Sequence, residues 1–142
     1  MWGWISMLCR SPEKTLTTAE ALSLLEDIAA HKQEHFIVLT LDSGHRLISK
    51  RIVFIGTVNS VQAHPREIYA GAIADSASGI IVAHNHPSGD PTPSRDDITT
   101  TQQLVAAGMM PCIKLHDHII VAGEEYFSFR AEGMLLQEIF EE

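Results

Sequence analysis

The chain has 142 residues, of which 45% are hydrophobic, and a formal net charge of −8, which suits one globular domain with a buried core. The acidic balance disfavours unaided nucleic-acid binding, because phosphate contacts need clustered Lys and Arg. No apolar run approaches the length of about 18 residues that a membrane-spanning helix requires, so no membrane contact is expected. Cys9 and Cys112 lie far apart and make no disulfide framework, which predicts reduced thiols in a cytoplasmic protein.

The N-terminal part of the chain predicts an apolar segment and then a helix. Met1 to Cys9 is apolar and lacks the basic start of a signal peptide, so it is interpreted as an ordered flap or a contact surface. Thr17 and Glu20 have the spacing of a capping box. Apolar residues then recur at helical spacing, which predicts a first helix from about Ala19 to Ala30.

A hairpin and a second helix follow. The run from Phe36 to Leu41 predicts a strand buried on both faces, and Arg46 to Ile55 predicts a second strand that pairs with it across a turn. His64 and Pro65 form a turn that begins a helix. The apolar stripe of this helix is expected to contain Ile68, Ala72 and Ile73.

The second half of the chain continues the alternation. Ile80 to Ala83 predicts a buried strand, and Ser94 begins a helix from about Arg95 to Ala107 that Gly108 closes. Ile113 to Ala122 predicts another strand, and the tail predicts a short strand near Phe127 and a terminal helix. This alternation predicts an α/β fold, layered around a mixed sheet.

The segment after the strand 80–83 predicts a metal site. If His84 and His86 end the strand, their rings point to the same face, and Pro87 then ends the strand. A rigid loop rich in proline leads to Ser94 and Asp97, and these two residues also have the spacing of an ordinary capping pair. Two imidazoles and one carboxylate would leave the fourth position of a tetrahedral zinc ion open to water, as in a catalytic site.

The pattern His-x-His-Pro followed by Ser-x-x-Asp resembles the JAMM (JAB1/MPN/Mov34) metalloprotease motif. Longer stretches are similar to the bacterial RadC family, namely Ala63–Glu67, Ala83–Ser94, Asp117–Val121 and Tyr126–Phe129. The resemblance covers about residues 11–134. Full RadC proteins carry a helix-hairpin-helix region for which these 142 residues leave no room, so we expect a single domain over 1–142 and a weaker link to DNA.

The resemblance implies a zinc hydrolase with a cytidine-deaminase-like α/β/α fold. His84, His86 and Asp97 would then bind Zn²⁺, and Ser94 would stabilise the oxyanion. The bond cleaved would be a peptide or isopeptide bond in a protein or peptide substrate. Whether the protein forms an oligomer stays open.

The family also uses a glutamate that takes a proton from the zinc-bound water. Glu34, just before the strand 36–41, is the choice for this role. Glu67 is the rival because it is nearer in sequence to the histidines, although an acidic residue is expected in the first turn of any helix.

Several polar residues near these motifs allow more than one interpretation. His116 and His118 alternate with Asp117, so they are expected to share a strand face, either as hydrogen-bonded residues beside the core or as groups that support the site. Asp90 is expected to stabilise the loop. Two other functions also remain open, a non-catalytic MPN-type interaction module and a DNA-repair accessory factor.

Overall fold

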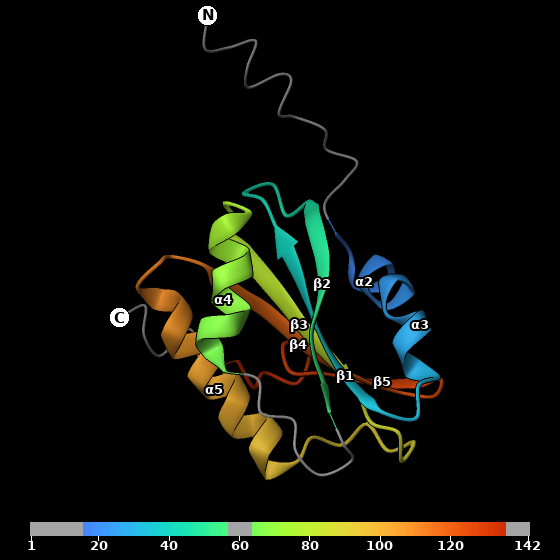
Figure 1. Ribbon diagram of the computed structural model, residues 1–142. Helices are drawn as coiled ribbons and strands as arrows, with labels where there is room; N and C mark the ends of the chain where they lie inside the picture. The colour runs from blue at the N-terminus through green and yellow to red at the C-terminus, as the bar shows by residue number, and fades with distance from the viewer. Residues whose placement is uncertain (1–15, 57–63, 136–142) are drawn as a thin grey trace, which may run out of the picture.

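The computed structural model describes residues 16–56 and 64–135, and within them five strands form one sheet (Figure 1). The strands are β1 (Glu34–Leu41), β2 (Leu47–Gly56), β3 (Gly79–Asn85), β4 (Lys114–Ala122) and β5 (Glu125–Ser128). Their order across the sheet is β2-β1-β3-β4-β5. β3 and β4 run parallel and the other neighbours are antiparallel, so the sheet is mixed, as predicted.

Helices cover both faces of this sheet, which gives the α/β/α layers that the family resemblance implies. α4 (Pro65–Ala74) and α5 (Arg95–Met109) lie on one face, and the shorter α2 (Thr18–Leu24) and α3 (Glu26–Ala29) lie on the other (Figure 1). β3 has strand neighbours on both sides and is buried along its whole length. Among residues 16–56 and 64–135, no helix is long and apolar enough to cross a membrane.

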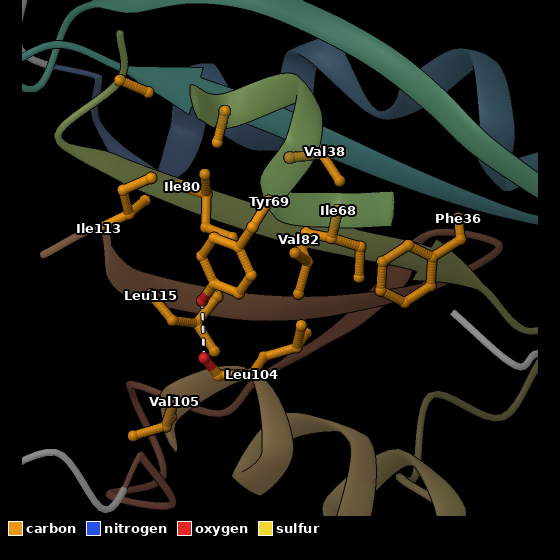
Figure 2. Packing of buried hydrophobic residues seen from close by; sticks show 12 residues of the cluster. Phe36, Val38, Ile68, Tyr69, Ile80, Val82, Leu104, Val105, Ile113 and Leu115 are labelled. Atoms are coloured by element: carbon orange, nitrogen blue, oxygen red, sulfur yellow. Dashed lines mark hydrogen bonds between the residues drawn. The ribbon is translucent and has the colours of Figure 1, made fainter. Parts of the chain in front are cut away.

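The central strands build a separate hydrophobic core on each face of the sheet, because successive side chains point to opposite faces. Phe36 and Val38 of β1 pack with residues of α4 and α5 (Figure 2). Ile37 and Leu39 pack with residues of α2 and α3. Each fully buried side chain of this size contributes about 1.5–3 kcal/mol to folding, so burial on two faces explains why residues 36–39 of β1 are all apolar.

Close packing of α4 against α5 depends on Tyr69 and Gly108. The Tyr69 hydroxyl donates a 2.6 Å hydrogen bond to the carbonyl oxygen of Leu104 (Figure 2). The sequence predicts that Gly108 closes α5, but this is wrong, because the helix continues to Met109 with Gly108 buried inside it. A Cβ atom at position 108 would lie 2.2 Å from the carbonyl oxygen of Ile113. The missing side chain therefore permits close packing.

The first predicted helix is interrupted. Its capping box is present, since Thr17 and Glu20 bond reciprocally. At Leu25, however, the backbone N–H bonds to the carbonyl oxygen of Leu22 at 3.0 Å, three residues back. An α-helix needs a bond four residues back, so the expected helix 19–30 becomes α2 and α3.

The buried face of α4 differs from the predicted stripe by one residue. His64 is the N-cap and Pro65 the first helical residue, as expected. Ile68 and Ala72 are buried, but Ile73 is 59% exposed. Tyr69 takes the third buried position, because it lies three residues before Ala72 and therefore on the same helical face as Ala72.

The predicted hairpin of β1 and β2 is present, and so is the short strand β5. β3 is longer than the run 80–83 and includes the first histidine. Cys112 is a free, exposed cysteine. The segment Met1–Cys9 and the predicted terminal helix, of which residues 136–142 form the end, lie outside the described residues.

Candidate metal centre

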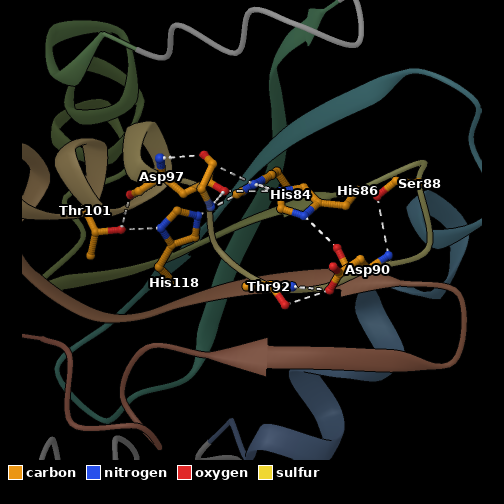
Figure 3. Close-up of polar contacts among 9 residues, drawn as sticks. His84, His86, Ser88, Asp90, Thr92, Asp97, Thr101 and His118 are labelled. Atoms are coloured by element: carbon orange, nitrogen blue, oxygen red, sulfur yellow. Dashed lines mark hydrogen bonds and ion pairs between the residues drawn. The ribbon is translucent and has the colours of Figure 1, made fainter.

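Three side chains that the sequence singles out meet at the end of β3 (Figure 3). His84 lies in β3, His86 follows it closely, and Asp97 lies in the first turn of α5. The strand ends at Asn85, so the expectation that Pro87 ends it is wrong by one residue. The N–H of His86 still donates to the carbonyl oxygen of Val121 at 2.9 Å, which holds the second histidine against β4.

The ring nitrogens and carboxylate oxygens of these residues lie close together. His84 Nε2 and His86 Nε2 are 3.0 Å apart, and each lies 3.1 Å from an oxygen of Asp97. One potential ligand atom from each residue lies within 4.8 Å of the others. Ligands at about 2.0 Å from a tetrahedral zinc ion lie about 3.3 Å from one another. These side chains therefore fit such an ion.

The electrostatics at Asp97 also suit a cation. The side chain of His84 is 1% exposed and that of Asp97 12%, so water screens their attraction weakly. Burial by itself would raise the pKa of Asp97, but hydrogen bonds with His84 and His86 outweigh burial and hold it well below its usual range. The hydrogen bond with Asp97 raises the pKa of His86. Both shifts mean that the site favours an ionised Asp97 carboxylate next to a positively charged group, such as a metal cation.

The loop after β3 fixes the ring of His86. Its Nδ1 lies 2.9 Å from the backbone carbonyl oxygen of Asp90. Because a carbonyl oxygen only accepts, Nδ1 carries the hydrogen and Nε2 is left to face Asp97. The carboxylate of Asp90 in turn accepts from the N–H and hydroxyl of Thr92, at 3.0 and 2.7 Å, and these bonds lower its pKa. Asp90 therefore stabilises the loop, as expected.

Ser94 and Asp97 form the capping pair that the sequence allows. The Ser94 hydroxyl accepts from the N–H of Asp97 at 3.1 Å, and Asp97 Oδ2 accepts from the N–H of Ser94 at 2.8 Å. The cap therefore orients the carboxylate that faces the histidines. Ser94 itself is exposed at the edge of this cluster, so it can cap α5 and contact a bound molecule at the same time.

Of the two candidate glutamates, the structure brings Glu34 to the histidines. It begins β1 and is half-buried. Burial raises its pKa, whereas the nearby His84 and His86 partly offset the increase. Glu67 is exposed in the first turn of α4. Electrostatic coupling to both histidines thus distinguishes Glu34 from its rival.

Asn85 holds the backbone around Glu34, and sequence reasoning missed it. Its fully buried side chain accepts from the N–H of His35 at 2.6 Å. It also donates to the carbonyl oxygens of His31 and Gln33, at 3.2 and 3.0 Å. Alternation along β3 was the available signal, because a residue between two histidines points away from them. Asn85 thereby links the histidine strand to the segment that carries Glu34.

The expectation that His116 and His118 share a strand face is wrong. In the pairing of β3 with β4, Ile80 lies opposite Leu115 but Ile81 lies opposite Asp117. His116 is therefore the extra residue of a β-bulge, which breaks the alternation. As a result, the ring of His116 lies against His45, whereas His118 lies against His84. Burial lowers the pKa of His118 well below its usual value.

The environment of His116 predicts that stability falls with acidification. Burial and the nearby charges of His45, Lys114 and Arg130 lower its pKa from 6.5 to about 4. Between these values the unfolded chain binds a proton that the folded protein does not, so the free energy of unfolding decreases as pH falls through this range. Urea unfolding at pH 7 and pH 5 should show a smaller loss for His116→Gln than for the wild type.

Other titrating groups and a control variant must be considered to attribute this pH effect to His116. His118 shifts in the same direction and remains in the variant, so His116→Gln should reduce the loss without abolishing it. The raised pKa values of Glu34 and Asp117 oppose the loss equally in both proteins. His64→Gln alters an exposed histidine and should behave like the wild type. Equal pH dependence in His116→Gln and His64→Gln would contradict the prediction.

Comparisons with known proteins agree with this architecture. Residues 14–134 match the family described as RadC-like JAB domain. A UPF0758 protein of Clostridium perfringens (strain ATCC 13124) is 45% identical over 112 residues, which are 79% of this chain and 49% of the relative. The UPF0758 protein YsxA of Bacillus subtilis (strain 168) is 43% identical over 126 residues, 89% of this chain and 52% of the relative.

The chain thus spans about half the length of the curated relatives it matches. The family match includes both histidines, Asp97 and Glu34. The mixed five-stranded sheet with helices on both faces is consistent with a JAB-domain fold. With this fold, a group of side chains that could hold a metal and a family match over most of its length, the chain belongs to the RadC family through its JAB domain.

Proposed function

We propose that the chain is a zinc-dependent hydrolase of the JAMM type, which cleaves a peptide or isopeptide bond in a protein or peptide substrate in the cytoplasm. One observation carries the proposal. His84, His86 and Asp97 converge on one point, and the half-buried Glu34 lies near enough to interact with all three. A site that only bound a structural metal would have no need of a partly buried carboxylate beside an open ligand position.

In this proposal His84, His86 and Asp97 hold the zinc ion. When bound, zinc supplies Lewis acidity, which polarises a carbonyl group and lowers the pKa of a water molecule toward about 7. The capping bond from Ser94 Nα to Asp97 keeps the carboxylate turned toward the two rings. The hydrogen bond from His86 to the Asp90 carbonyl keeps the second ring in place.

Glu34 and Ser94 perform the steps that belong to the protein. The Glu34 carboxylate accepts a proton from water and returns it to the leaving amine. Partial burial raises the pKa of Glu34, which makes it a better proton acceptor. Capping uses Ser94 Oγ as an acceptor, so its hydroxyl hydrogen remains available to an oxyanion.

Two other functions have less support. A non-catalytic MPN-type module would bind partners without needing the convergent side chains or the half-buried glutamate. A DNA-repair accessory factor that contacts DNA directly would need a basic surface, whereas the chain carries a net charge of −8.

The proposal is tested by digestion of a peptide library, followed by mass spectrometry. Cleavage is expected with zinc, should disappear with a chelator and should return when zinc is restored. Asp97→Asn should bind zinc more weakly and lose cleavage, although its amide oxygen can still cap α5. The neighbouring Asp96→Asn, which alters an exposed carboxylate of the same helical turn, should behave like the wild type.

The outcomes separate the competing functions. Cleavage that persists in the chelator would contradict a metal-dependent hydrolase. Zinc binding without cleavage of any library peptide would favour the interaction module. Tight zinc binding by Asp97→Asn would mean that the ligand set is wrong.

A further inference from the structure

A series of hydrogen bonds links His84 and Asp97 through His118 and Thr101, which are both buried (Figure 3). His84 Nδ1 lies 2.9 Å from His118 Nε2, and His118 Nδ1 lies 2.6 Å from Thr101 Oγ1. Thr101 Oγ1 donates to the backbone carbonyl oxygen of Asp97 at 2.7 Å. The hydrogen bonds thus connect His84 of β3, through His118 of β4 and Thr101 of α5, to the backbone of Asp97, which is another candidate ligand.

The donor and the acceptor of each of these hydrogen bonds can be assigned, starting from the bond between Thr101 and the Asp97 carbonyl oxygen. The Asp97 carbonyl oxygen can only accept, so the single hydroxyl hydrogen of Thr101 points toward it. Toward His118, Thr101 Oγ1 therefore accepts, and His118 Nδ1 must carry a hydrogen. The ring of His118 is fully buried against Phe129 and Phe36, which favours a neutral imidazole. Its Nε2 then accepts the hydrogen of His84 Nδ1.

The result determines which nitrogen of His84 is free to bind a metal. When His84 is neutral and its hydrogen is on Nδ1, the lone pair lies on Nε2, which is the form of the ring that binds a metal. This atom faces His86 Nε2 at 3.0 Å and Asp97 Oδ1 at 3.1 Å. The hydrogen-bond chain and the direct contact together close a ring through His84, His118, Thr101 and Asp97.

We propose that Thr101 and His118 are positioning residues that set the tautomer and orientation of His84 for zinc binding. The inference rests on the proposed metal site, and it assigns a role to two residues outside the ligand set. Partners of metal-bound histidines are commonly carboxylates, backbone carbonyls or water. A neutral imidazole in that place adds no negative charge beside the site, so a bound ion would keep more of its Lewis acidity.

A matched pair of substitutions at Thr101 tests the proposal. Thr101→Val keeps the shape of the side chain and removes the hydroxyl, whereas Thr101→Ser keeps the hydroxyl and removes a methyl group. Thr101→Val is expected to weaken zinc binding by about 10- to 100-fold, measured by competition with a chromophoric chelator. Thr101→Ser should stay close to the wild type. Because Thr101 is 1% exposed, a role in packing alone would reverse this order.

The tautomers are measured directly in zinc-free protein with ¹⁵N-labelled histidine. Long-range ¹H–¹⁵N NMR spectra should show the hydrogen on Nδ1 in both His84 and His118 of the wild type. The Nδ1 form should lose population in Thr101→Val and persist in Thr101→Ser. Absence of the hydrogen from Nδ1 of His84 in the wild type would overturn the inference, even if Thr101→Val did not fold.

The two measurements separate this inference from the proposed function. If the wild-type protein bound no zinc, the metal site would fail, whereas the tautomers would still report on the hydrogen-bond chain. If Thr101→Val bound zinc as tightly as the wild type with unchanged tautomers, the positioning role would be wrong and the proposed hydrolase would be unaffected.

Discussion

Replacement of Glu34 by glutamine is expected to lower kcat/KM by about 10²- to 10⁴-fold, the usual contribution of a general acid–base group, while zinc binding persists. The amide occupies nearly the same volume but cannot accept a proton from water. Glu34 interacts electrostatically with His84, His86 and Asp97 but belongs to a different strand, so its loss should spare the ligands. Initial rates on a peptide identified in the library digestion, together with a zinc titration, measure the two effects separately.

The matched control is Glu67→Gln, which makes the same chemical change on the exposed face of α4. It should leave both the rate and the zinc affinity unchanged. A Glu34→Gln protein that retains zinc and full activity would remove Glu34 from the reaction. Inactivation by Glu67→Gln instead would reassign the proton acceptor to the first turn of α4.

Replacement of Asn85 by alanine is expected to destabilise the folded protein by about 3 kcal/mol, because its buried side chain loses three hydrogen bonds of about 1 kcal/mol each. The lost partners are backbone groups of His31, Gln33 and His35, on both sides of Glu34. The substitution should therefore also lower activity at saturating zinc, since the glutamate is less firmly held. Urea unfolding gives the first effect, and the rate on the same peptide gives the second.

Gln103→Ala is the control for this substitution, since it also removes an amide side chain but from an exposed position of α5. Its effect should stay within about 0.5 kcal/mol, as for most surface substitutions. An Asn85→Ala protein as stable as Gln103→Ala would mean that the buried hydrogen bonds contribute little. If the Asn85→Ala protein were destabilised but normally active, the hydrogen bonds of Asn85 would not be needed to position Glu34.

Much of the fold could be predicted because the patterns that indicate strands and helix ends involve residues close together in the sequence. The unbroken apolar runs of β1 and β3 indicate strands buried on both faces, and both strands are buried. The capping pairs at Thr17 and Ser94 mark where two helices begin, and both caps are present. Each of these features depends on residues that are only a few positions apart, so the sequence alone is enough to predict it.

Predictions failed where distant segments decide the local outcome. The bulge at His116 arises from the pairing of β4 with β3, and no pattern within 114–122 reveals it. Gly108 has the residue type of a helix end, yet it serves the close approach of Ile113. Ile73 and Tyr69 are both apolar, and only the position of α5 decides which of them is buried.

For the candidate site, the sequence by itself determined the residue types and spacing of His84, His86 and Asp97, since they lie in one short segment made of a strand end, a loop and the first turn of a helix. Only the tertiary structure shows that Glu34 interacts electrostatically with both histidines, because sheet register brings β1 beside the end of β3. The contact of Asn85 with His35 spans 50 residues, and that of His84 with His118 spans 34. Such contacts depend on how strands pair and helices pack, and local side-chain periodicity does not encode that pairing.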